Sequence, residues 1–192
     1  MNPGLIAFLV LVAVVALVIL VVIVIYNSMI RSRNMVDQGW SGIDVQLKRR
    51  HDLIPNLVEA VKGYAAHERE TLLAVIEARA EAMAADGPAA SGAAESVVDR
   101  ALGRLFAISE AYPQLRATEN FQQLQAELAN TEDQIAAARR IYNGNVQLYN
   151  TKIQVFPNLL LADAWDFTPR EFFEIADPAE REPVEVLSSP RA

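Results

Sequence analysis

The longest apolar stretch of the sequence lies near its start. Residues Leu5–Tyr26 contain neither a charged residue nor a proline. As an α-helix they would span about 30 Å, the thickness of the hydrocarbon core of a bilayer. A cleaved signal peptide would instead need a basic leading segment, a shorter apolar core and a small-residue cleavage site, which this region lacks. The pattern therefore predicts a retained transmembrane helix over residues 5–26, in contact with membrane lipid, after a short N-terminal segment, residues 1–4.

Two basic residues flank the carboxyl end of this span. Arg31 and Arg33 follow it closely, whereas only the chain's amino group precedes it. Because short loops rich in Lys and Arg stay on the cytoplasmic side of a membrane, these membrane-flanking arginines predict a cytoplasmic body. The span has no small-xxx-small pattern, so assembly is expected from the rest of the chain.

After the span, apolar residues recur at intervals of three and four residues and their sums, as in a helix that packs against neighbours. The series is Val36, Trp40, Ile43, Leu47, Ile54, Leu57, Val61, Tyr64, Leu72 and Val75, with Arg79 at its end. Pro55 lies inside it and has no N–H to donate to the carbonyl of His51. Since the periodicity continues in phase, we expect a helix kink at Pro55 within one long element. Gly63 is a second weak point.

Two further helices follow a connection. Gly, Pro, Ser and Ala dominate residues 82–95 and predict a turn or short mobile segment. One helix is expected from about Ser96 to Ala111, and the next opens with Thr118 as N-cap and runs to Phe156, where Pro157 stops or bends it. The second stripe comprises Phe121, Leu124, Leu128, Thr131, Ile135, Ala138, Tyr142, Val146, Tyr149 and Ile153.

No strand-like alternation interrupts these elements. The predicted fold class is all-α, with the N-terminal transmembrane helix continuing into an antiparallel bundle of long helices over residues 27–157. Residues 158–192 form an acidic C-terminal tail. Its aromatic residues predict that part of it docks on the bundle or on another copy, and its last ten or so residues have the composition of disordered chain.

Composition excludes several kinds of site. The net charge is −7 and there is no cysteine, which argues against nucleic-acid binding and excludes thiol chemistry. His67 opens a stretch, HERET, that resembles a zinc-protease helix, but Thr71 stands where the second histidine ligand is needed. Neither His51 nor His67 has the Glu-x-x-His spacing of di-iron bundles. We therefore expect no catalytic, cofactor-binding or metal-binding residues, and no cofactor.

The chain contains one run of three consecutive basic residues, Lys48, Arg49 and Arg50. Its binding partner, lipid or protein, has to be inferred. On a straight helix they lie on the order of 30 Å beyond the span, whereas lipid charge is screened within about 8–10 Å at cellular salt. We expect this run to make a protein contact with acidic groups on a neighbouring helix, the tail or another subunit. A plain solvated face is the alternative.

The helix over residues 137–157 carries several Asn and Tyr residues. Asn is a poor choice inside a helix because its side chain competes for backbone hydrogen bonds. This pattern indicates polar pairing with another helix or with the backbone freed near Pro55. A water-lined interior is the alternative.

Two long segments carry a resemblance. The chain resembles the LemA family of bacterial membrane proteins over Tyr26 to about Ala162, in "YNSMIRSRNMVDQGWSGIDVQLKRRHDLIPNLVEAVKGYAAHERETLLAVIEARA" and "EAYPQLRATENFQQLQAELANTEDQIAAARRIYNGNVQLYNTKIQVFP". The resemblance implies one N-terminal membrane helix, a helical-bundle body and a place in the bacterial inner (cell) membrane. Gly39, "TEDQI" and "DAWDF" depart from the family's usual residues.

These observations favour a non-enzymatic, single-pass membrane protein that acts as a self-assembling scaffold in envelope organisation, with coiled-coil packing and a homo-oligomeric state. The alternative is a monomeric adaptor for a membrane protease or sensor in envelope quality control, because members of the family are often encoded near membrane metalloproteases. An enzyme that uses buried carboxylates is a third hypothesis.

Overall fold

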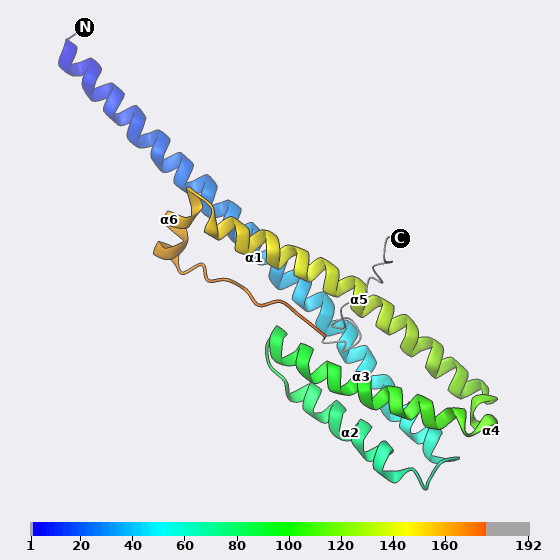
Figure 1. The fold of residues 1–192 in the computed structure, drawn as a ribbon. Helices are drawn as coiled ribbons and strands as arrows, with labels where there is room; N and C mark the ends of the chain where they lie inside the picture. The colour runs from blue at the N-terminus through cyan, green and yellow to red at the C-terminus, as the bar shows by residue number, and fades with distance from the viewer. Residues whose placement is uncertain (1, 176–192) are drawn as a thin grey trace, which may run out of the picture. The chain divides into compact units, whose positions relative to one another are not determined.

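The computed structural model describes residues 2–175, and every regular element in this part of the chain is a helix (Figure 1). The elements are α1 (Pro3–Lys62), α2 (Arg69–Ala84), α3 (Pro88–Glu110), α4 (Pro113–Arg116), α5 (Glu119–Gln154), α6 (Asn158–Ala162) and a 3-10 helix, η1 (Asp163–Trp165). Among the described residues there is no strand, and the predicted all-α class is confirmed. The predicted disorder of the last residues concerns positions outside the described ones.

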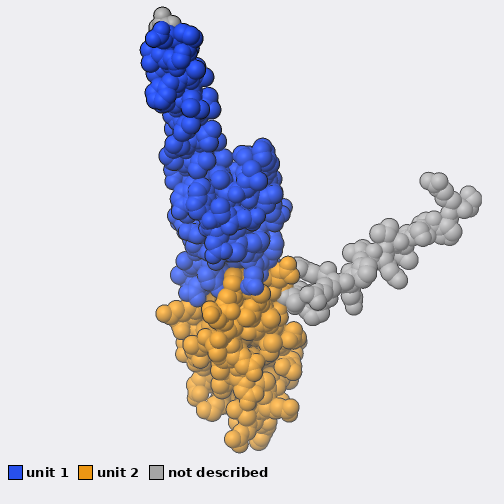
Figure 2. All heavy atoms as spheres, turned by 90° about the vertical axis from the view of Figure 1, so that its left-hand side faces the viewer, with its two compact units in different colours: residues 1–45, 135–172 blue, residues 46–134, 173–192 orange. Residues whose placement is uncertain are grey.

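The chain divides into two compact units (Figure 2). Unit 1 comprises Met1–Val45 and Ile135–Phe172, and unit 2 comprises Gln46–Gln134 and Phe173–Ala192. Helices α1 and α5 each contribute to both units. The boundaries expected from the sequence, at residues 4, 26 and 157, stay a prediction.

In unit 1, the first part of α1 is exposed and apolar, and the rest packs against α5. By length and composition, α1 is the one helix among the described residues that could cross a membrane. Beyond this stretch, α1 and α5 bury side chains at intervals of three, four or seven residues, so that one face of each helix enters the core. These side chains are Met29, Val36, Ile43, Ile135, Tyr142, Val146, Tyr149 and Ile153.

In unit 2, four helices and the end of α1 enclose one core. The periodic residues of α1, α2, α3, α4 and α5 meet there, since each helix can shield its apolar stripe only against another. The buried members are Ile54, Leu57, Val58, Val61, Ala65, Leu72, Val75, Ala78, Ala82, Val98, Ala101, Leu102, Leu105, Leu115, Phe121, Leu124 and Leu128.

The apolar series from Val36 to Arg79 belongs to two helices. α1 ends at Lys62, next to the weak point at Gly63, where the amides of Tyr64 and Ala65 both donate to the carbonyl of Val61. A turn then leads to α2 at Arg69. The apolar residues keep the same helical spacing across this turn because both helices face the same core. Their spacing alone therefore could not show that one helix ends and another begins here.

The prediction that residues 82–95 form a connection is wrong except at residues 85–87, because residues 82–84 belong to α2 and residues 88–95 to α3. α3 begins at Pro88, seven residues earlier than the chain position Glu95 at which the connection was expected to end. Pro88 occupies the first turn of a helix, where a missing N–H costs nothing, and the alanines that follow favour helix. Gly87 precedes it with φ 82°, a backbone angle that suits glycine.

The N-terminus of α5 is as expected. The helix begins at Glu119, and the hydroxyl of Thr118 accepts a hydrogen bond of 3.4 Å from the amide of Phe121, as an N-cap does. Nine of the ten residues predicted for its stripe are buried, and Ala138 is half-buried.

Candidate functional site

Pro55 lies within α1, and the helix continues past it to Lys62. Because proline has no N–H, the carbonyl of His51 loses its usual helical donor. The guanidinium of Arg79, on α2, supplies a replacement: its Nε donates to this carbonyl at 2.7 Å. This bond accounts for a charged residue at the end of an apolar series, because Arg79 faces α1 to reach a backbone group.

The three residues of the basic run differ in burial. Lys48 and Arg49 are exposed, whereas Arg50 is fully buried. The Nη1 of Arg50 donates to Asp99 Oδ1 at 2.6 Å and to Glu132 Oε1 at 2.8 Å, and its Nη2 donates to Glu95. Glu95 and Asp99 lie on α3 and Glu132 on α5. Arg50 thus connects three helices of unit 2 through carboxylates, and we call these four residues the Arg50 network.

His51 adds a second contact to the network. Its Nε2 lies 2.8 Å from Oε1 of Glu95, a carboxylate with 0% of its side chain exposed. A buried carboxylate is stable only where charged or polar donors replace water, and Glu95 has both Arg50 and His51. The Nε of Arg50 has no hydrogen-bond partner among the described residues. The network therefore joins α1, α3 and α5 within unit 2 by charge-assisted hydrogen bonds.

The acidic members of the network were not predicted from the sequence. Glu95 and Asp99 are four residues apart on α3 and so share a face, which is the signal that could have identified them. It was missed because residues 82–95 were expected to lie outside a helix. Among the described residues, no group of histidines and carboxylates is arranged to hold a metal ion.

Asn and Tyr side chains of α5 make hydrogen bonds to other segments of unit 1. Asn145 Nδ2 donates to the carbonyl of Met35 on α1 at 3.0 Å. Asn150 exchanges two hydrogen bonds with the backbone of Arg170, its Nδ2 donating at 2.9 Å and its Oδ1 accepting at 2.8 Å. The Asn145 bond matches the expected polar pairing with another helix, whereas Asn150 pairs with the backbone of the tail and the carbonyl freed by Pro55 accepts from Arg79.

Two tyrosines of α5 also hold the chain after η1. Tyr142 Oη donates to the carbonyl of Glu171 at 2.8 Å, and Tyr149 Oη donates to that of Thr168 at 3.0 Å. Burial raises the pKa of both tyrosines above the ordinary value of 10.0, and the positive charge of Arg170 lowers each pKa by a smaller amount. Both hydroxyls therefore stay protonated and able to donate at neutral pH.

The end of the described chain packs on α3 in unit 2. Phe173 is fully buried. At Gly92, an added Cβ would lie 2.4 Å from the carbonyl oxygen of Glu174, so only glycine allows the backbone of the tail to lie this close to α3. Of the other aromatic residues singled out from the sequence, Phe167 is buried, while Trp165 and Phe172 remain substantially exposed.

The two membrane-flanking arginines have different surroundings. Arg31 is exposed. The guanidinium carbon of Arg33 lies 5.4 Å from the ring centroid of Phe167, a cation–π distance. Arg33 therefore contacts the tail within unit 1.

Together, these features define a class: helical proteins with one membrane-length apolar helix and a body whose buried polar groups join helices to one another and to the tail. The chain belongs to the LemA family, whose model matches residues 39–187. The resemblance seen in the sequence is thereby confirmed.

Individual relatives are distant. Magnetosome protein MamQ 2 of Paramagnetospirillum magneticum is 26% identical over 175 residues, which cover 78% of this chain and 64% of the relative. Protein LemA of Metamycoplasma hominis is 28% identical over 152 residues, covering 79% of this chain and 69% of the relative. Magnetosome protein MamQ of Magnetospirillum gryphiswaldense is 27% identical over 174 residues, covering 77% and 64%. The chain thus spans less than two thirds of the magnetosome relatives' length.

Proposed function

We propose that this protein is a non-enzymatic, single-pass membrane scaffold that assembles with copies of itself through the outer face of α2. The apolar part of α1 anchors it in the bacterial inner membrane, and the body lies on the cytoplasmic side. The relatives' names refer to magnetosomes in some cases and not in others. The role that fits all of these relatives is a physical one, assembly at the membrane in envelope organisation.

The observation that carries the proposal is an apolar stripe on the exposed side of α2. Leu73, Ile76 and Met83 are 45%, 46% and 58% exposed, and Ala80 between them is exposed as well. We call these four residues the α2 stripe. Their spacing of three, four and three residues is that of the a and d positions of a coiled coil. The side chains that α2 sends into the core, from Leu72 to Ala82, lie on a neighbouring face of the helix.

A second copy is the partner that this pattern fits, because a stripe of a and d positions is complementary to itself. α2 has 16 residues and offers only about two heptads, so pairing between free helices would be weak. Anchoring each copy in one membrane raises the effective concentration of the stripes. A short stripe can then support reversible assembly without a large interface.

The test measures copy number in membrane. The full chain is extracted in native nanodiscs and weighed by mass photometry, as wild type, as L73E/I76E and as I141E/L148E. The control pair carries the same substitutions at Ile141 and Leu148, which are 63% and 64% exposed on α5. We expect oligomers for the wild type and the control, and monomers for L73E/I76E.

Two results would contradict the proposal. Unchanged oligomers in L73E/I76E would exclude the α2 stripe as the contact. A monomeric wild type whose in vivo crosslinks lead mainly to one other membrane protein would favour the adaptor role for a protease or sensor.

A further inference from the structure

A cluster of exposed apolar side chains lies where α5 ends and the chain turns back. Val155, Phe156, Leu159, Leu160 and Trp165 are 46%, 79%, 45%, 65% and 41% exposed. We call these five residues the 155–165 patch. Large apolar side chains that gather on a surface usually mark a contact with a protein or a membrane. The α2 stripe belongs to unit 2, whereas this patch belongs to unit 1.

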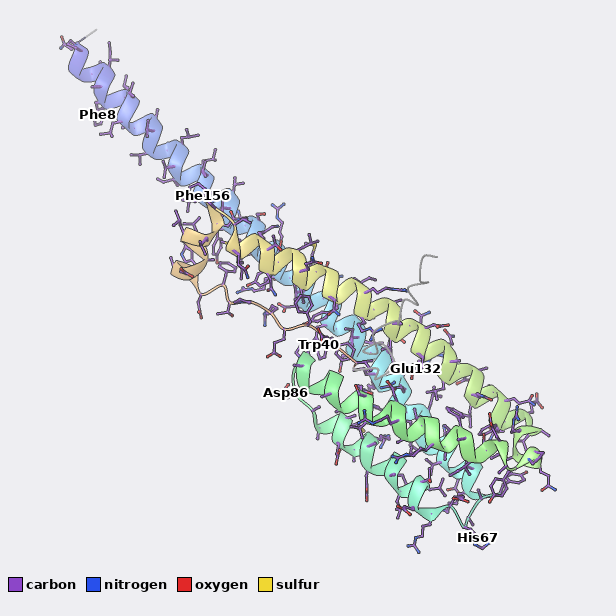
Figure 3. The ribbon with its side chains drawn as sticks, in the orientation of Figure 1. Phe8, Trp40, His67, Asp86, Glu132 and Phe156 are labelled. Carbon is purple, nitrogen blue, oxygen red and sulfur yellow. The ribbon has the colours of Figure 1, made fainter. Side chains whose placement is uncertain are left out.

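The register of the helices in unit 1 places the patch beside the end of the apolar span. α5 runs antiparallel to α1: a Cβ on Gly39 would lie 3.2 Å from Cα of Tyr142, and Asn145 bonds to Met35. Phe156 follows Asn145 by eleven residues, as Val24 precedes Met35 by eleven. Phe156 is therefore level with the last turn of the span, and Figure 3 shows it beside α1.

Aromatic contacts hold the other end of the patch at the same level. The ring of Trp165 meets that of Tyr26 edge-on, with centroids 5.0 Å apart, and Phe167 lies 5.8 Å from Tyr26 in the same manner. Tyr26 is the last residue of the apolar run. Tyr and Trp prefer the boundary between lipid and water, because their rings are apolar and each carries one polar group.

Polar and basic groups begin immediately beyond this level. Lys152 Nζ donates to the carbonyl of Ser28 at 3.4 Å, to the hydroxyl of Ser28 at 3.2 Å and to Ser32. Arg31 and Arg33 lie on the same part of α1. The order along unit 1 is thus apolar span, aromatic pair with the 155–165 patch, then cations. A bilayer has the same order of hydrocarbon, interface and anionic headgroups.

We propose that the 155–165 patch inserts into the interfacial layer of the bilayer leaflet at which the apolar part of α1 ends. It would be a second lipid contact, made by the end of α5, α6 and η1 and distinct from the transmembrane helix. The inference rests on the proposed membrane span, because it is the span that brings the patch to the lipid surface. Two contacts, one along α1 and one beside it, restrict rotation of unit 1 about the axis of α1.

The chain has no cysteine, so single cysteines can carry a spin label without competing sites. The full chain is placed in nanodiscs of phosphatidylethanolamine and phosphatidylglycerol, labelled in turn as L160C, F156C, I141C and V14C. Collision rates with oxygen, which concentrates in lipid, and with a water-soluble nickel chelate are measured by electron paramagnetic resonance. Ile141 is the matched control, since it is 63% exposed where Leu160 is 65% exposed. Val14 reports the span.

We expect the oxygen-to-nickel ratio at L160C and F156C to exceed that at I141C several-fold and to stay below that at V14C, which lies near the middle of the span. A lipid-like ratio at V14C with a water-like ratio at L160C and F156C would overturn the inference and leave the span intact. Labels at the patch that are shielded from both reagents and broadened by a second label would show a second copy there, which also overturns it. A water-like ratio at V14C would overturn the span and the inference together.

Discussion

Arg49 and Arg50 are adjacent in the chain and identical in chemistry, but only Arg50 is buried. The difference follows from their angular positions, since successive helical residues point about 100° apart. Arg50 points into unit 2 and meets Glu95, Asp99 and Glu132, while Arg49 stays in solvent. Removing the cation would leave Glu95 charged in the core with only His51 beside it.

We expect R50A to lower the free energy of unfolding by about 3–5 kcal/mol, the usual cost of breaking a buried ion pair. R49A, the matched control, should change it by less than about 0.5 kcal/mol, as at most exposed sites. Urea denaturation of the full chain in detergent, followed by circular dichroism, measures both. Equal midpoints for the two variants would show that the Arg50 network contributes no stability.

Tyr142 and Tyr149 make the fold sensitive to alkaline pH. Burial raises the pKa of both in the folded state, so folding favours the protonated hydroxyl. The stability they contribute is complete below the unfolded pKa of about 10 and is lost as pH rises through the higher folded pKa. Ionisation also removes the hydrogens donated to Glu171 and Thr168.

We therefore expect the tyrosinate absorbance of the wild type to show late-titrating components that are absent from Y142F/Y149F. The protection of the amides of residues 168–171, measured relative to their intrinsic exchange rates, should fall over the same pH range. A wild-type titration that ends with the free-tyrosine curve would contradict the burial of these hydroxyls.

At the scale of elements, α1 tolerates Pro55 because α2 provides a donor at the interrupted position. The carbonyl of His51 accepts from Arg79 in place of the absent N–H of residue 55. The kink expected at Pro55 stays a prediction, while the continuation of α1 to Lys62 is observed.

A double-mutant cycle tests this compensation. R79M should cost about 1.5–3 kcal/mol, as expected for a hydrogen bond from a charged donor. In a P55A background the same substitution should cost less, because residue 55 then donates to His51 itself, and the coupling should be at least about 0.5 kcal/mol. Thermal or urea unfolding of the four proteins gives the coupling. Additive effects would show that Arg79 does not replace the lost donor.

The contact between α3 and the tail can be tested with two glycines of the same helix. G92A should push the backbone of Glu174 away from α3 and expose Phe173, at a cost of about 1.5–3 kcal/mol for a large apolar side chain. At Gly103 an added Cβ meets nothing within 4 Å, so G103A should stabilise α3 by about 0.5–1 kcal/mol.

Hydrogen exchange of residues 173–175 and the unfolding midpoint distinguish the two variants. Faster exchange is expected in G92A alone. Unchanged exchange in G92A would show that the tail accommodates the methyl group without leaving α3.

For the whole molecule, the direction of membrane insertion determines which compartment the body meets. Arg31 and Arg33 favour a cytoplasmic body through the positive-inside bias. Either of two single cysteines in the cysteine-free chain can report this: Asn2, before the span, and Ala89, exposed on α3.

We expect a membrane-impermeant maleimide to label N2C in intact cells and A89C only after lysis. The two positions act as controls for each other, because a correctly inserted span places them on opposite sides of the membrane. The reverse pattern would place the body outside the cytoplasm and contradict the positive-inside interpretation.

Most of the helical stripes could be predicted because they depend on local periodicity. The apolar residues from Phe121 to Ile153 recur with the 3.6-residue period of a helix, and α5 buries this face. The N-cap at Thr118 could be predicted because its hydrogen bond lies within one helical turn. Helix boundaries were harder to predict where the apolar residues of two successive helices followed the same periodicity, as around Gly63. They were also harder to predict where alanines alternated with Gly and Pro, as before Ser96. There, local propensity and core packing compete, and only the packed structure shows which prevails.

The sequence by itself determined the features that each segment decides alone: an apolar span of membrane length, an all-α body and the helical face on which each apolar residue lies. Only the tertiary structure decided which polar groups meet. Arg50 with Glu95, Arg79 with His51, and Gly92 with Glu174 are contacts between segments far apart in the chain. Periodicity specifies the face of a helix but not the partner across it, because the partner depends on how several helices share one core.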